Sequence, residues 1–221
     1  MSLQNVIDNA AQITFGSRKV VNSTITRSGR IRSSLLVGNQ PFLIIAEYAP
    51  IATYADVRGV LESIDNLDAI GSEAINIGGT NTGLSWITAY QGDLNSTQLG
   101  DITATTTYSG RTITLSTASV SGSPSDYVFK SGDFFQLDGG YKYPYKVVDD
   151  VQLGSSGTIT VTLNRPVIEQ DGYTINTGKG ILVGGDVTWQ VQMLDKPTFT
   201  VLPSRYVQFD GEFSLMEVID D

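Results

Sequence analysis

The side chains that most enzymes use for nucleophilic catalysis are missing here, because the sequence contains no histidine and no cysteine. Ser-His-Asp and Cys-His systems and His/Cys zinc sites are therefore excluded. Carboxylates remain, since the chain has 23 Asp and Glu residues. Asp133, Asp149 and Asp150 could form a glycosidase pair or supply oxygen ligands to calcium. Acids in turns and at strand ends are mostly solvated, so we expect no enzyme, no cofactor and no metal site.

A glycine-rich stretch from Gly172 to Gly180 includes Thr177-Gly-Lys-Gly180 and superficially resembles a phosphate-binding loop. The interval from Gly172 to Gly178 is one residue too long for that motif. Gly180 also stands where the motif needs a magnesium-binding Ser or Thr. The stretch therefore predicts a hairpin loop and no nucleotide site.

Tyr141, Tyr143 and Tyr145 alternate along the chain just after Gly139-Gly140. Aromatic rings are frequent anchors in binding sites, so these three could form a peripheral surface for sugars or bases. The same alternation is found on the two faces of a strand start, and this alternative stays open. Trp86 and Trp189 are expected in the core.

The basic residues are concentrated near the N-terminus of a chain whose formal net charge is −9. The segment from Asn9 to Ala46 contains five cations and no acid, namely Arg18, Lys19, Arg27, Arg30 and Arg32. One interpretation is a solvated strand face. The other, which we adopt as a prediction, is an intersubunit contact with an acidic partner such as another copy of this chain. The net negative charge argues against general affinity for nucleic acids.

A single helix is predicted at residues 53–70, where apolar residues recur at helical spacing. The apolar stripe comprises Val57, Val60, Leu61, Ile64 and Leu67. Thr53 and Asp56 supply a capping pattern at its start. One amphipathic helix among strands must bury its stripe against a sheet.

The rest of the chain predicts a mainly β protein, because Thr, Ser and Val segments alternate with glycine turns. Residues 20–26 and 35–48 read as a long hairpin around Ser28-Gly29. Short strands from residue 84 to 180 predict an inserted small β-barrel or sandwich. Residues 1–83 with 181–221 are expected to form the other β domain, which carries the helix. No stretch of 18 apolar residues is present, so no membrane span is expected.

Several short motifs, taken in their order along the chain, resemble baseplate-hub and distal-tail proteins of tailed bacteriophages. They are Arg18 to Arg30, Gln40-Pro-Phe42, Tyr54 to Arg58, Trp86 to Gly92, Ser131-Gly-Asp133, Tyr143-Pro-Tyr145, Asn164-Arg-Pro166, Val187-Thr-Trp189 and Phe209-Asp-Gly-Glu-Phe213 with Glu217. Each motif is short and common alone, and the similarity lies in their order over nearly the whole chain.

This resemblance implies a tail-tube-like β-barrel or sandwich with one flanking helix and an inserted β domain. It further implies a structural virion protein, made in the host cytoplasm, that forms a ring, usually a hexamer. Such a ring joins the tail tube to the tail tip, contacts other hub or fibre proteins, and lets DNA pass through. An acidic wall suits passage because it does not trap phosphates. A carbohydrate-binding β module, with Tyr141, Tyr143 and Tyr145 as its platform, is the alternative.

Overall fold

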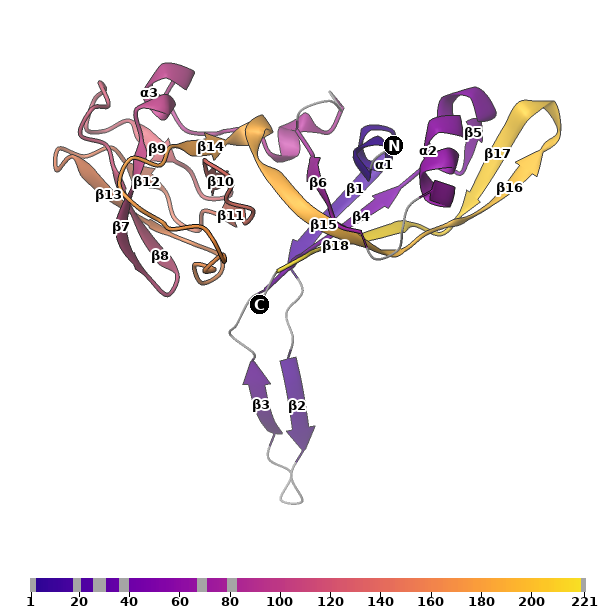
Figure 1. Cartoon of the computed structure of the whole chain (residues 1–221), viewed down its shortest axis with the longest axis horizontal. Helices are drawn as coiled ribbons and strands as arrows, with labels where there is room; N and C mark the ends of the chain where they lie inside the picture. The colour runs from indigo at the N-terminus through magenta and orange to yellow at the C-terminus, as the bar shows by residue number, and fades with distance from the viewer. Residues whose placement is uncertain are drawn as a thin grey trace.

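The computed structural model describes residues 3–17, 21–25, 31–35, 40–66, 71–78 and 83–219. Figure 1 shows a central sheet with a compact group of short strands on one side, a bent hairpin on the other and a separate two-stranded hairpin below. The predicted mainly β class is confirmed. Strands dominate because β-branched and aromatic residues alternate with polar ones between glycine turns.

The central sheet has five antiparallel strands in the order β1-β4-β18-β15-β6. Their bounds are Gln12–Ser17 (β1), Phe42–Glu47 (β4), Glu73–Asn76 (β6), Thr188–Asp195 (β15) and Phe213–Glu217 (β18). The alternation within β4 buries Phe42, Ile44 and Ala46 on one face. In the register of the sheet, Phe15 lies opposite Ile44, and Leu215 lies opposite Ile44 from the other side. All of these side chains therefore share one core face.

Three of these strands continue past bends into a second sheet, which we call the wing. The wing consists of β5 (Ile51–Thr53), β17 (Tyr206–Asp210), β16 (Thr198–Leu202) and the turn Pro203–Arg205. Its strand order, β16-β17-β5, repeats the order β15-β18-β4 of the strands that lead into it. The central sheet and the wing therefore form one curled ribbon, whose far end is the yellow hairpin of Figure 1.

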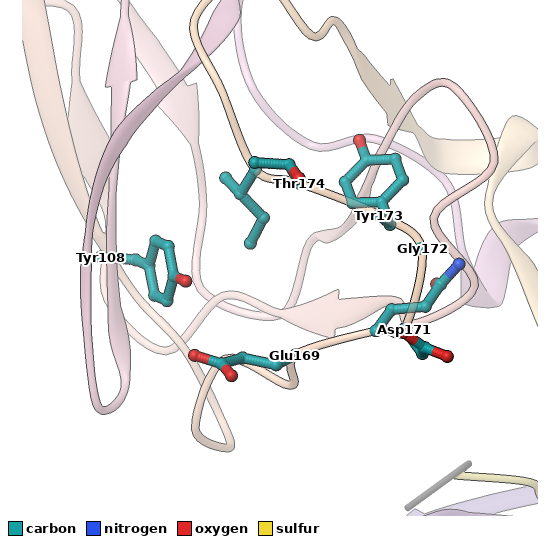
Figure 2. A pocket seen from close by; sticks show the side chains of 8 residues that line it. Tyr108, Glu169, Asp171, Gly172, Tyr173 and Thr174 are labelled. Atoms are coloured by element: carbon teal, nitrogen blue, oxygen red, sulfur yellow. The ribbon is translucent and has the colours of Figure 1, made fainter.

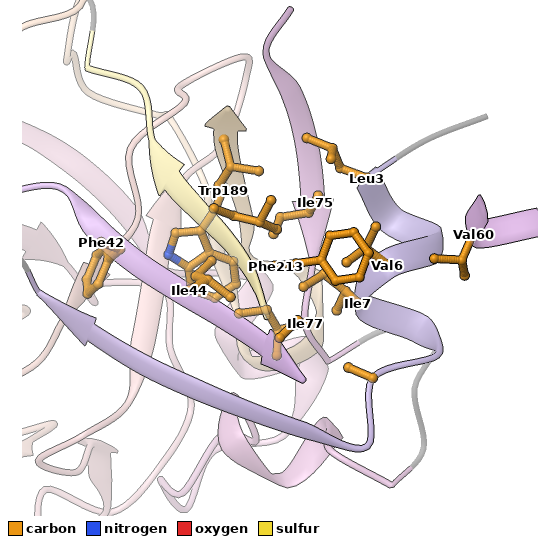
Figure 3. Packing of buried hydrophobic residues seen from close by; sticks show 14 of the residues in the cluster. Leu3, Val6, Ile7, Phe42, Ile44, Val60, Ile75, Ile77, Trp189 and Phe213 are labelled. Carbon is orange, nitrogen blue, oxygen red and sulfur yellow. The ribbon is translucent and has the colours of Figure 1, made fainter. Parts of the chain in front are cut away.

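Two helices cover the core face of this ribbon. Helix α2 (Tyr54–Asn66) lies against the wing, and the short helix α1 (Leu3–Asp8) contacts both α2 and β6. Figure 3 shows Leu3, Val6 and Ile7 of α1 beside apolar side chains of the sheet, with Val60 of α2 on the other side of α1. Burial of Val57, Val60 and Leu61 confirms the start of the predicted stripe. The predicted helix extended to residue 70, and residues 67–70 lie outside the described residues.

The predicted N-terminal hairpin has two parts. Strands β2 (Val21–Ile25) and β3 (Ile31–Leu35) pair with each other, and β1 pairs with β4 closer to the core. Figure 1 shows β2 and β3 projecting away from the other sheets. The second strand of the predicted hairpin, residues 35–48, was wrong in its bounds because β3 ends at Leu35 and β4 begins at Phe42.

Residues between β6 and β15 form the inserted part. Its strands are β7 (Thr103–Ser109), β8 (Thr112–Ser116), β9 (Tyr127–Phe129), β10 (Phe134–Leu137), β11 (Tyr145–Lys146), β12 (Val151–Gln152), β13 (Thr158–Thr162) and β14 (Ile181–Val183). Its helical segments are η1 (Ser85–Ile87), α3 (Ser96–Gly100) and η2 (Gly184–Asp186). They enclose a second hydrophobic cluster built from residues 94–175, separate from the cluster of the ribbon and its helices. The division at residues 84 and 180 remains a prediction.

Phe134 is the residue of the inserted part that enters the ribbon core. Its ring lies edge-on to Phe15 and Trp189, at centroid distances of 5.3 and 5.6 Å. Trp189 is fully buried, as predicted. Trp86 is 69% exposed, so its expected place in the core was wrong. It lies in η1, which is a single short turn whose side chains are not covered by either cluster.

Candidate assembly surface

The wing is the place where this fold leaves large apolar side chains uncovered. Eight such side chains are exposed in the described part of the chain, and five of them lie on the wing or at the first residue of α2. The five are Ile51, Tyr54, Phe199, Val201 and Tyr206. Single exposed apolar residues are ordinary, whereas a concentration on one element marks an interaction surface.

The register of the wing explains why Phe199 and Val201 are uncovered. Val207 and Phe209 of β17 are buried, and they pair with Val201 and Phe199 of β16. Paired residues in an antiparallel sheet point to the same face. Phe199 and Val201 therefore point to the core face, but they remain 37% and 62% exposed because they lie on the outermost strand.

A pocket of about 480 Å³ lies at the wing tip. It is lined by Thr53, Tyr54, Ala55, Arg58, Ser204, Arg205 and Tyr206. Tyrosine and arginine are the residue types that most often carry binding energy in protein interfaces. Arg58 bonds Glu62 across one helical turn, Nε to Oε1 at 3.0 Å, and both side chains are largely exposed.

The turn that carries this pocket has an uncommon backbone. Ser204 and Arg205 have φ angles of 64° and 68°, and they are the non-glycine residues with positive φ in the described part of the chain. Such conformations cost on the order of 1 kcal/mol each and persist where the surrounding structure holds them. The turn therefore holds Arg205 and Tyr206 in a set orientation at the end of the wing.

The sequence-predicted contact residues are only partly placed. Arg18, Lys19, Arg27 and Arg30 lie outside the described residues. Arg32 belongs to β3, where its backbone pairs with Thr24. Their role as intersubunit contacts remains a prediction, and it stands apart from the surface on the wing.

The possible binding surface at Tyr141, Tyr143 and Tyr145 was wrong. All three side chains are at most 3% exposed, so no ring face is free for a ligand. The Tyr141 hydroxyl donates to the carbonyl of Ile168, and the amide of Ile168 donates to the Tyr145 hydroxyl at 2.8 Å. Burial raises the pKa of Tyr145 above its ordinary value. These tyrosines are part of the core of the inserted part.

The acids considered for catalysis or calcium have structural partners. Asp133 is 2% exposed, and its carboxylate accepts the amides of Gln91 and Lys130, each at 2.8 Å. Burial raises the pKa of Asp133, and these two amides oppose that shift. Asp150 accepts the amide of Ser131 at 2.8 Å. Among the described residues, no group of three or more potential metal ligands is present.

A second pocket, of about 420 Å³, lies in the inserted part (Figure 2). Tyr108 lines one side, and the loop carrying Glu169, Asp171 and Tyr173 lines the other. The Tyr173 hydroxyl donates to the carbonyl of Asp138 at 2.6 Å, so it is already engaged. Two carboxylates beside aromatic rings could accept hydrogen bonds. No sequence pattern signals this arrangement, because its residues come from distant segments.

A buried ion pair joins the inserted part to the ribbon. Arg165 and Glu217 are both fully buried, and Arg165 Nη2 lies 2.7 Å from Glu217 Oε1. The guanidinium also donates to the carbonyls of Gln40 at 3.0 Å and Pro144 at 2.7 Å. Its central carbon lies 4.8 Å from the ring centroid of Phe42. The pair is therefore well supported on both sides of the junction.

Sequence reasoning named neither Arg165 nor Glu217 as a site residue, although a signal for Glu217 was present. The alternation in β18 places Glu217 on the same face as buried Phe213 and Leu215. A charged residue on a core face needs a partner. The amide of Phe42 also donates to Glu217 Oε2 at 3.0 Å. The identity of the partner could not be predicted, because Arg165 lies in an irregular segment after β13, far away in the sequence.

No protein-family model matches the sequence, and no curated protein matches it. Within the described residues, no helix has the length and apolar character needed to cross a membrane. The structural features that bear on function are the wing, its tip pocket and the buried junction.

Proposed function

We propose that this chain is a structural subunit of a bacteriophage tail, which forms a ring at the distal tail or baseplate hub. The observation that carries the proposal is the wing, which exposes four large apolar side chains beside the exposed Tyr54 of α2 and ends in a tyrosine- and arginine-lined pocket. A subunit that exposes such a surface is stabilised by burying it against a partner. The resemblance in the sequence supports the choice of partner, namely other copies and neighbouring tail proteins.

The junction between the two parts also suits a scaffold. In addition to the Arg165–Glu217 pair, Gln136 of the inserted part accepts the amide of Thr188 at 3.0 Å. Parts that are joined through buried polar contacts keep one relative orientation more readily than parts joined by a linker alone. A ring subunit needs such a fixed orientation to present its peripheral part in the same way around the ring.

Native mass spectrometry and electron microscopy of the purified chain over a range of concentrations test this proposal. We expect rings, and we expect Val201→Lys to prevent them, because the substitution puts a charge at the most exposed apolar side chain of the wing. Val148→Lys is the matched control, since Val148 is 43% exposed but lies on the inserted part. A chain that stays monomeric at every concentration, also with the other tail proteins of its phage present, contradicts the proposal.

The carbohydrate-binding alternative has lost its platform because Tyr141, Tyr143 and Tyr145 are buried. No other observation favours it over assembly, so it is not proposed here.

A further inference from the structure

In the described part of the chain, the ribbon has four edge strands, namely β1 and β6 in the central sheet and β16 and β5 in the wing. β6 carries the charged residue Glu73 and β5 has three residues, so β1 and β16 are the longer uncharged edges. Unpaired edges expose rows of amide and carbonyl groups, and proteins usually protect them with charges, proline or bulges. β1 (QITFGS) and β16 (TFTVL) contain no charged residue and no proline.

These two edges differ from the edge of β13 in the cover of their core-facing residues. Ile13 and Phe15 of β1 are half-buried, and Phe199 and Val201 of β16 are exposed. By contrast, β13 is also an edge strand without charges, but its Ile159 and Val161 are at most 6% exposed. At β1 and β16, therefore, both the backbone edge and the apolar side chains lack a full set of neighbours.

The two edges lie on opposite sides of one ribbon. The wing strands β5, β17 and β16 continue β4, β18 and β15 in the same order, and β1 pairs with β4 on the side away from β15. β16 therefore has its free edge on the β6 side of the ribbon, and β1 has its free edge on the other side. One chain cannot join these two edges to each other, but two copies placed side by side can.

The sequences of the two edges are complementary. β1 contains Ile13-Thr14-Phe15, and β16 contains Phe199-Thr200-Val201, so each has a threonine between two core-facing apolar residues. Pairing centred on the threonines sets Thr14 beside Thr200, with apolar pairs on either side, whichever way the strands run. Aromatic, β-branched and Thr–Thr pairs are among those that stabilise adjacent strands.

We propose that β16 of one copy pairs with β1 of the next, so that the ribbons of neighbouring subunits form one continuous sheet. The contact is head-to-tail, because each copy contributes a different edge to its two neighbours. Repetition of such a contact gives a ring if the rotation closes and a filament if it does not. This inference rests on the proposed ring function and names the contact that builds the ring.

The absence of cysteine from the chain allows a direct test by thiol cross-linking. Thr14 and Thr200 are both exposed, so Thr14→Cys and Thr200→Cys can be combined without disturbing the core. With a short bifunctional maleimide, we expect the double variant to give a ladder of covalent oligomers up to the closed ring. Each single variant should give none. Thr14→Cys with Thr160→Cys is the matched control, because Thr160 is an exposed threonine on the edge strand β13.

The outcomes separate this contact from the proposed function. Rings that form without a covalent ladder, or a ladder of equal yield from the Thr14/Thr160 control, would overturn the edge pairing and leave the ring in place. A covalent dimer from Thr200→Cys alone would overturn it in favour of wing-to-wing contact. A cysteine-free chain that forms no ring under any condition would overturn the proposed function, and this inference with it.

Discussion

At the residue scale, the buried pair of Arg165 and Glu217 makes a prediction about stability. Removing one partner leaves the other charge buried and uncompensated, so Glu217→Leu and Arg165→Met should each cost about 3–5 kcal/mol of unfolding free energy. The double variant Arg165→Met/Glu217→Leu should cost less than either single variant, because no buried charge remains. Urea unfolding of the four proteins gives the coupling energy. Additive losses would show that the two side chains do not act as a pair.

The buried tyrosines predict a loss of stability at alkaline pH. Burial raises the pKa values of Tyr141 and Tyr145 above the ordinary value of 10.0 for a tyrosine, because the phenolate is poorly solvated in the core. Below pH 10, both the folded and the unfolded chain keep these protons, so stability is unaffected. Above pH 10, the unfolded chain releases them while the folded chain retains them, so the unfolding free energy falls by about 1.4 kcal/mol per tyrosine per pH unit.

Urea midpoints measured at pH 8 and pH 11 check this expectation. The double variant Tyr141→Phe/Tyr145→Phe should be less stable at pH 8, since it loses hydrogen bonds to Ile168, but should lose less stability on going to pH 11. Tyr206→Phe removes the hydroxyl of an exposed tyrosine and serves as the control. An unchanged pH dependence in the double variant would assign the alkaline loss to other groups.

The residue-scale features differ in how far the sequence could predict them. Burial of Trp189 follows from the alternation of β15, which puts Val187, Trp189 and Val191 on one face. The alternation of Tyr141, Tyr143 and Tyr145 suggested an exposed binding surface. That prediction was wrong because these residues lie largely in an irregular segment that folds into the core. Hydrogen bonds to Ile168, more than twenty residues away, hold that segment there. Such non-local contacts leave no periodic signal in a sequence.

At the element scale, both the apolar periodicity of helix α2 and its observed packing predict that its buried face stabilises the ribbon. Leu61 is 6% exposed and belongs to the ribbon core, so Leu61→Ala should cost about 2–5 kcal/mol of unfolding free energy. Glu62→Ala, the neighbouring change, should cost under about 0.5 kcal/mol, since the Arg58–Glu62 pair is largely exposed. Chemical denaturation of both variants tests the docking of the helix. Losses of equal, small size would mean that α2 does not stabilise the ribbon.

Elements with strong local signals were predictable, and those defined by distant partners were not. The apolar stripe of α2 and the hairpin turn at Ser109-Gly110 are each determined by residues that lie close together in the sequence. Gly110 has a φ of 54° and joins β7 to β8, as a tight turn requires. Helix α1 has six residues, too few for a periodic pattern, and its buried Leu3, Val6 and Ile7 find their partners on β6 and α2.

At the scale of the whole molecule, the bent ribbon was the feature that sequence reasoning missed. The apolar alternation of the sequence identifies β15, β16, β17 and β18 as strands, but it does not show that β16 and β17 leave the central sheet. The bends fall at Lys196-Pro197 and Gly211-Glu212, between the paired segments. Proline cannot donate to a strand ladder, and Gly211 has a φ of 100°. These two local breaks create the wing, on which the proposed assembly depends.

The last prediction concerns the basic segment, which is independent of the wing. Five cations and no acid lie between Asn9 and Ala46 in a chain of net charge −9, and β2 and β3 project away from both hydrophobic clusters. The available acidic partner is another copy or a neighbouring tail protein, and opposite charges across such contacts fix register and orientation. Arg27→Glu/Arg30→Glu/Arg32→Glu should therefore leave the circular dichroism and urea midpoint of the monomer unchanged, because charges that act across contacts between subunits contribute little to the stability of one subunit.

The same triple variant should abolish ring or tail assembly, since like charges brought together at a contact can cost several kcal/mol. Electron microscopy of assemblies from the variant is the measurement, and Arg111→Glu, at an exposed position of the inserted part, is the control for a charge reversal outside this segment and outside the wing. Normal assemblies from the triple variant would show that these arginines are only a solvated face. Tails that assemble but fail to eject DNA would place them in the lumen, where acidic side chains in place of arginines change the wall that DNA meets.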